Sequence, residues 1–303
     1  MTGRLVHTGQ VIVDLVMRVP GLPPAGGDVL ASSTRMRAGG GFNVMAAAAR
    51  AGADVLYTGG HGTGRFGDLA RAALAGEGIT VALPADPDAD TGICVALVDD
   101  AGERTFVTGS GAESATRGAP APVGSGDVVY VSGYSLLVPE KAQALVTLLE
   151  RGTGTLLVDP GPLVDDIDAA VWASVLARTG VLSVNAREAV LLSGETGLDA
   201  AGRALARRLP DGAAVVVRDG AAGCLLIRDG VVETVAGVAV TAVDTNGAGD
   251  AHCGVLAAEL LRGADLRTAV TRANAAAALA VTRHGPATAP TRDEVDALLA
   301  TRA

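Results

Sequence analysis

The segment AVDTNGAGDAHCGVL, residues Ala242–Leu256, decides the fold. It continues an apolar run, VAVTAV at 238–243, that has the composition of a β-strand, and it then passes through a turn of small residues into a helical pattern. Gly247, Ala248 and Gly249 carry little or no side chain, so a ligand can approach their backbone. Their N–H groups would open the following helix, and such a terminus attracts anions. The segment therefore predicts a strand, an anion-binding turn and a helix.

Asp250 places a carboxylate directly after this turn. A carboxylate beside an anion site is a poor choice for phosphate binding alone, but it is suited to deprotonating a hydroxyl that attacks a phosphate, as in a kinase. The alternative is a tight strand-to-helix turn in which Asp250 only offsets the helix dipole. The segment alone leaves both interpretations open.

Composition excludes several classes of protein. The net charge of the 303 residues is −9, with 24 basic and 33 acidic residues, which does not suit a nucleic acid or an anionic membrane as partner. No apolar run reaches the roughly 18 residues of a membrane span, and no leader frames the N-terminal apolar run. The three cysteines are far apart in apolar context and predict core thiols. We therefore expect a soluble cytoplasmic protein.

The order of elements predicts an α/β fold with a mostly parallel central sheet flanked by helices. After Gly126, apolar strand patterns alternate with helical ones at 139–150, 167–178 and 186–193. Earlier strands at 11–19 and 28–37 and a hairpin at 91–98 and 104–108 are typical of antiparallel pairing. Because these pieces are not contiguous, they predict a small β lid from about 11–37 and 91–108 on one domain, 1–303.

Three further motifs carry polar residues at predicted element ends. Asn43 in AGGGFN begins a helix, where an Asn is also a common cap. Asn185 and Glu188 in NARE have the spacing of a capping box, as do Thr291 and Glu294. Asp14 interrupts the strand VIVDLVM and needs either a partner or an exposed face.

With these motifs in the same order and at similar spacing, the chain resembles the ribokinase-like (PfkB) carbohydrate kinase family from about Gly9 to the C-terminus. DTNGAGD at 244–250 is similar to the family's C-terminal signature and AGGGFN at 38–43 to its N-terminal one. The resemblance implies that Asp250 is the catalytic base and that the amides of Gly247, Ala248 and Gly249 hold the transferring phosphoryl group. It also implies a set of substrate contacts: Asp14, Gly39, Gly40, Asn43 and Tyr134. Ile12 and Tyr134 depart from ribokinase itself, which argues against plain ribose as the substrate.

The same resemblance implies sites for ATP and for cations. The nucleotide contacts would be Asn185, Arg218, Gly220, Gly223 and Asn274, of which the last four are also explained by a hairpin turn and a helical Asn. Glu188 would organise Mg²⁺ through water. The backbone at Asp244, Asn246 and Gly285 would hold a monovalent cation such as K⁺. His252, beside the proposed base, we interpret as packing.

The predicted function is transfer of the ATP γ-phosphate to a hydroxyl of a sugar or sugar-like small molecule. The alternatives are a nucleoside kinase of the same fold and a non-catalytic regulator that binds a sugar or nucleotide. We also predict closure of the lid on substrate and a homodimer formed through it, since open β edges tend to be paired. The acceptor is expected to be uncharged, with Arg35, Arg37 and Arg65 forming a solvated rim.

Overall fold

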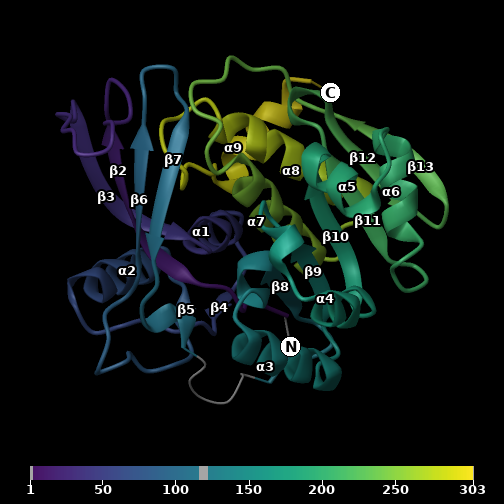
Figure 1. Ribbon diagram of the computed structural model, residues 1–303. Helices are drawn as coiled ribbons and strands as arrows, with labels where there is room; N and C mark the ends of the chain where they lie inside the picture. The colour runs from purple at the N-terminus through teal and green to yellow at the C-terminus, as the bar shows by residue number, and fades with distance from the viewer. Residues whose placement is uncertain (1–2, 116–121, 303) are drawn as a thin grey trace.

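The computed structural model describes residues 3–115 and 122–302 (Figure 1). The predicted domain 1–303 also includes residues 1–2, 116–121 and 303, which lie outside the described residues. Within the described ranges, no helix has the length and apolar character needed to cross a membrane.

A large sheet of nine strands forms the centre of the molecule, in the order β13-β12-β11-β10-β9-β8-β1-β4-β5. Pairing is parallel from β5 to β11, and only β12 and β13 join antiparallel at one edge. The mostly parallel sheet predicted from the sequence is thus confirmed. The strands are β1 Leu5–His7, β4 Val55–Tyr57, β5 Thr80–Val81, β8 Val128–Ser132, β9 Thr155–Asp159, β10 Thr179–Asn185, β11 Ala214–Arg218, β12 Gly223–Arg228 and β13 Val231–Ala236.

Helices cover both faces of this sheet because its strands are apolar on both sides. In β9, for example, Leu157 packs into one core cluster while Leu156 and Val158 pack into the other. The helices of the first cluster are α1 Phe42–Arg50, α2 Arg65–Gly76, α7 Ala248–Leu261 and α8 Leu266–Ala280, with α9 Arg292–Ala300 against α8. Those of the second are α3 Pro139–Arg151, α4 Ala169–Leu176, α5 Ala186–Ser193 and α6 Leu198–Ala206. Short 3₁₀ turns lie at Ala112–Ser114, Gly133–Leu136, Val164–Asp166 and Gly220–Ala222.

The early strands form the predicted small sheet, which stands beside the main sheet in Figure 1. Its order is β3-β2-β6-β7, from β2 Val11–Arg18, β3 Ser33–Gly40, β6 Ile93–Val98 and β7 Arg104–Gly109. We call this four-stranded sheet the lid sheet. It has β2 and β6 parallel in its middle and antiparallel partners outside them.

Several local predictions need correction. The second strand is Ser33–Gly40 and not 28–37, because its ladder with β2 continues to the pair Val11 and Gly40. Residues 238–243 are not a strand, since the amides of Val243 and Asp244 bond to the Val281 carbonyl at the end of α8. Helix α2 begins at Arg65, inside the glycine-rich segment 59–68 that by composition would be a loop, because the remote carboxylate of Asp90 accepts the amides of Phe66 and Gly67.

Candidate active site

The turn at Gly247 is built as an anion-binding helix start. Gly247 has φ +77°, and a Cβ there would lie 1.9 Å from the Pro286 carbonyl oxygen, so only glycine fits. Helix α7 begins at Ala248, whose amide makes a long 3.4 Å bond to the Thr245 carbonyl. Within the described part of the chain, the amides of Gly247 and Gly249 have no hydrogen-bond acceptor. These free donors fit an anionic ligand.

Asp250 lies in the first turn of α7 and bonds to the other signature motif. The Asn43 side-chain amide donates to its Oδ2 at 3.0 Å, joining residues 207 positions apart. The pKa of Asp250 is raised to about 6, because burial and the Asp159 charge raise it by more than the Asn43 bond and the Arg218 charge lower it. A carboxyl group with this pKa is ionised at neutral pH and can still accept a proton, as a general base must.

Asn43 does not cap its helix. It is the second residue of α1, and the preceding N-cap, Gly41, has no side-chain capping bond. The capping interpretation of this residue is therefore wrong. Asn43 is buried, and its Oδ1 has no partner among the described residues, which leaves one acceptor next to Asp250.

Asp14 and Gly39 lie against each other on neighbouring strands of the lid sheet. A Cβ on Gly39 would be 2.0 Å from Asp14 Oδ2, so the absent side chain makes room for this carboxylate. The pKa of Asp14 is raised to about 6, because burial and the Asp250 charge raise it by more than the Arg37 charge lowers it. Asp14 therefore lies within electrostatic reach of Asp250. Gly40 follows at φ +62° and turns the chain toward α1.

Tyr134 follows β8 and lies near the same carboxylates. Tyr134 is 40% exposed. Burial of its hydroxyl raises the pKa of Tyr134, and the charges of Cys94, Asp250 and Asp159 add to the shift. The predicted substrate contacts are thus brought to one region, between the lid sheet and the start of α7.

Arg218 is the last residue of β11 and lies next to the anion turn. It forms an ion pair with Asp159 at 3.0 Å and a longer one with Glu188 at 3.6 Å. Its Nη1 is 3.4 Å from the Gly249 carbonyl oxygen. These neighbouring carboxylates raise the pKa of Arg218 although burial opposes the shift. Asp159 was missed from the sequence. It stands at the carboxyl end of a parallel strand, where ligands of such sheets bind, and that position was the available signal.

Asn185 and Glu188 form the capping box that their spacing indicates. The Asn185 side chain accepts the Glu188 amide, and Glu188 Oε2 accepts the Asn185 amide at 2.8 Å. Burial and the Asp159 charge raise the pKa of Glu188, while the Asn185 amide and Arg218 lower it. These two residues therefore cap helix α5 and also belong to the candidate site.

The other predicted nucleotide contacts lie at the β12–β13 edge. Gly220 and Gly223 have φ +52° and +101°, and a Cβ on Gly223 would be 2.2 Å from the Val235 carbonyl oxygen. The Asn274 amide donates to the carbonyls of Val235 and Ala236, and its Oδ1 accepts from Cys224. Both polar ends of Asn274 thus bond to protein. His252 is buried beside Cys224, as expected for packing.

The side chain of Asp244 ties the anion turn to its surroundings. It accepts the amides of Asn246 and Gly285, each at 3.0 Å, and it pairs with Arg104 of the lid sheet. Burial opposes ionisation, but these two amides and Arg104 lower the pKa of Asp244. The carboxylate thus organises the loop whose backbone we predicted to bind a monovalent cation.

The carboxylates near the anion turn can be compared with the ligands that a divalent metal ion requires. In the described residues, no group of three or more His, Cys, Asp or Glu side chains could hold an ion. Glu188 and Asp159 supply carboxylate oxygens near the anion turn, though both face Arg218. This set fits Mg²⁺ in its usual kinase form, held mainly by substrate phosphates and water.

Fold and site together define an α/β protein that presents an anion-binding helix start beside a carboxylate with a raised pKa. The model of the pfkB family carbohydrate kinases matches residues 2–292. An uncharacterised sugar kinase of Escherichia coli (strain K12) is 30% identical over 293 residues, 95% of this chain and 91% of the relative. An ATP-dependent ribose-1-phosphate kinase of Halopiger xanaduensis is 32% identical over 305 residues, 99% of each chain.

A solved structure agrees over the same length. The aminoimidazole riboside kinase of Salmonella enterica has a TM-score of 0.82 at 26% identity, covering 98% of this chain and 100% of that one. The chain therefore belongs to the pfkB family of carbohydrate kinases, and it is a sugar kinase of the ribokinase-like fold.

Proposed function

We propose that this enzyme transfers the γ-phosphoryl group of ATP to a hydroxyl of a sugar, with Asp250 as the general base. The observation that carries the proposal is the contact of Asn43 with Asp250, because it joins the substrate motif to the anion turn. It places a carboxyl group of raised pKa next to free backbone donors.

Each residue would have a defined part in the transfer. Asp14 and the free Oδ1 of Asn43 accept hydrogen bonds from acceptor hydroxyls and so orient the attacking oxygen. That oxygen forms a bond to the γ-phosphorus as the bond from phosphorus to the β,γ-bridging oxygen breaks, and ADP leaves. The hydroxyl proton passes to Asp250. The amides of Gly247 and Gly249 stabilise the charge on the transferring oxygens.

ATP as the donor is supported by two of the similar proteins. The Halopiger xanaduensis relative is named as ATP-dependent, and the Salmonella enterica structure holds an ATP analogue together with a riboside. Arg218, Gly220, Gly223 and Asn185 would lie along the nucleotide, with Asn274 acting through the strand end that it bonds. When bound, Mg²⁺ would neutralise phosphate charge, and Glu188 would hold it through water. A K⁺ ion on the backbone of Asp244, Asn246 and Gly285 stays a prediction.

The first test is the substitution Asp250→Asn. Loss of a general base typically lowers the rate by about 10²- to 10⁴-fold and leaves ground-state binding largely intact. We expect this fall in kcat for ADP release over a panel of sugars, sugar phosphates and nucleosides, with ATP binding retained by calorimetry.

The matched control is Asp229→Asn. Asp229 is exposed in the β12–β13 turn at φ 50°, a conformation that Asn also tolerates. It should keep full activity. Wild-type turnover by the Asp250→Asn enzyme would disprove the assignment of the base, and release of ADP with nucleosides alone would favour the nucleoside kinase alternative.

A further inference from the structure

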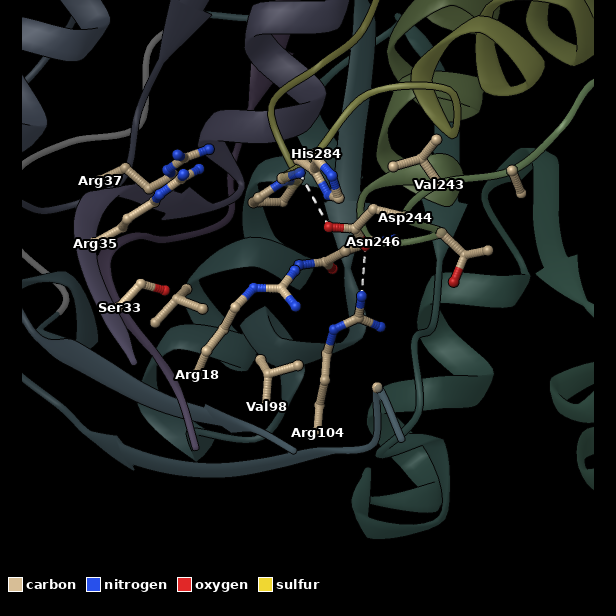
Figure 2. Close-up of a pocket in the computed structure, with 16 residues that line it drawn as sticks. Arg18, Ser33, Arg35, Arg37, Val98, Arg104, Val243, Asp244, Asn246 and His284 are labelled. Carbon is tan, nitrogen blue, oxygen red and sulfur yellow. Dashed lines mark hydrogen bonds and ion pairs between the residues drawn. The ribbon is translucent and has the colours of Figure 1, made fainter. Parts of the chain in front are cut away.

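A cavity of about 560 Å³ opens between the lid sheet and the loops on either side of the anion turn (Figure 2). On the core side it is lined by residues 242–246 and 284–286. On the lid side the lining begins at Arg37, which is the direct cross-strand neighbour of Asp14. It continues from there along the strands, away from Asp14. The cavity is therefore adjacent to the predicted sugar contacts, although Asp14 and Asp250 do not line it. We call it the arginine cavity after four of its residues: Arg18, Arg35, Arg37 and Arg104.

Strand register explains why these four side chains converge. Directly paired residues point to the same face of a sheet, and so do residues two apart along one strand. Asp14 pairs with Arg37, and Val16 pairs with Arg35. Arg18 pairs with Val98, which in turn pairs with Arg104. All four arginines thus share the face of the lid sheet that carries Asp14.

The positive charge of this cavity is only partly balanced by the described residues. Of the four arginines, Arg104 alone forms an ion pair with a carboxylate among the residues that the structure describes, and that partner is Asp244. In the described ranges, no carboxylate lies within the 4.0 Å ion-pair distance of Arg18, Arg35 or Arg37. His284 adds another basic group to the lining. Figure 2 shows Arg35 and Arg37 side by side, with Arg18 reaching toward Asn246. In a chain with a net charge of −9, three guanidinium groups without an ion-pair partner among the described residues thus line one cavity.

A solvated rim does not account for the position of Arg37. Arg37 is half-buried, and its Nη1 is so close to Gly285 that a Cβ there would approach it to 2.3 Å. Arg18 and Arg35 are exposed, as Arg65 is, but both line the cavity, whereas Arg65 lies outside it over the ring of Phe66. Clustered guanidinium groups in a cavity match the geometry of a phosphate, which accepts paired hydrogen bonds from them.

We propose that the arginine cavity binds a phosphate group already present on the acceptor, so that the enzyme phosphorylates a sugar phosphate. The proposal rests on the kinase function above and replaces our expectation of an uncharged acceptor. Neighbouring side chains on the same face of a strand are two residues apart, a step of roughly 7 Å. Arg35 lies one such step from Asp14 and Arg18 lies two steps, roughly 14 Å, from it. A sugar held at Asp14 would therefore point its far end toward Arg35, with Arg18 reaching it from further along the same face, while Asp14 itself contacts hydroxyls.

Direct binding without ATP tests this proposal independently of turnover. The probes are ribose 1-phosphate and fructose 6-phosphate, each compared with its parent sugar by calorimetry. The variants are Arg18→Ala and Arg35→Ala, with Arg65→Ala as the matched control. We expect each sugar phosphate that binds to do so at least tenfold more tightly than its parent. Both cavity variants should remove tenfold or more of that affinity, about 1.4 kcal/mol, and change binding of the parent sugar less than twofold. Arg65→Ala should change neither.

Other outcomes would overturn the proposal. It fails if neither sugar phosphate binds better than its parent, or if the cavity variants weaken both equally. It also fails if those variants weaken only ATP, since the cavity would then belong to the nucleotide phosphates. Binding of a sugar phosphate that depends on the arginines, with no ADP release on any acceptor, would instead refute the kinase function and leave the anion site in place.

Discussion

At the scale of single residues, the protonation of Asp250 should control the acid side of catalysis. A base must be deprotonated to act, so kcat/KM should rise with pH and level off above about 6, the pKa to which burial raises this carboxyl group. The Asn43 bond lowers that pKa, so Asn43→Ala should move the acid limb to higher pH. The measurement is kcat/KM between pH 5 and 8 for both proteins. An unchanged midpoint in the variant would contradict the assignment.

The pH dependence of folding stability provides a control, because stability should fall over the pH range in which kcat/KM rises. Because the folded pKa lies above the ordinary Asp value of 3.8, the folded state binds the proton more tightly than the unfolded state. This group therefore lowers stability as pH rises through the window from 3.8 to about 6. Asp250→Asn lacks this effect, so its melting temperature relative to the wild type should increase across that window. A constant difference would indicate that the carboxyl group titrates normally.

Residues inside contiguous motifs could be predicted from the sequence, whereas residues that meet across the fold could not. Asp250 and Gly247 were found because a turn of small residues and a helix start are local features. Asp159, Arg18 and Arg104 were not, since their roles come from strand ends and from register between distant segments. Arg35 and Arg37 were noticed together with Arg65, but without Arg18 and Arg104 beside them a solvated rim was the simpler interpretation.

At the scale of elements, Arg104 of β7 links the lid sheet to the anion turn. Its guanidinium pairs with Asp244, 140 residues away, and Asp244 also holds the Gly285 amide. The arginine side chain is 27% exposed, so the pair should contribute at most about 1 kcal/mol. We expect Arg104→Ala to speed amide hydrogen exchange in β6 and β7 by a few-fold and to raise KM for the acceptor, with little change in melting temperature.

The matched control for Arg104 is Arg203→Ala, which breaks a pair with Asp199 inside a single helix, α6. That variant should leave exchange in the lid sheet unchanged. Equal exchange in β6 and β7 for wild type and Arg104→Ala would show that the ion pair does not hold the lid sheet against the core.

Element boundaries show where local patterns are insufficient. The apolar run 238–243 has strand composition, but its partner is the end of α8 and not another strand. Helix α2 starts earlier than its apolar pattern because Asp90, more than twenty residues further along, accepts its first amides. In both cases a distant hydrogen-bond partner decides the structure, and no local signal reports it.

At the scale of the whole molecule, alternation of strands and helices was sufficient to predict the parallel sheet. The discontinuous lid sheet also followed from the sequence, because its strands alternate with period two and lie outside the βα repeats. What the sequence could not supply is the pairing order that places β2 beside β6. That order sets the two faces of the lid sheet, one with Asp14 and the arginines and the other largely apolar.

The apolar face of the lid sheet predicts a homodimer. By register, Leu15, Met17, Val95, Leu97 and Val107 point away from the Asp14 face, and Val107 is 68% exposed. A second copy would remove this apolar surface from water and cover the open strand edges. We expect light scattering to give the mass of a dimer and Val107→Lys to give a monomer, because a buried unpaired charge is costly. Val231→Lys is the matched control, since Val231 is 66% exposed on the edge strand of the main sheet. A wild-type monomer at micromolar concentration, or dissociation by the control substitution alone, would rule out this interface.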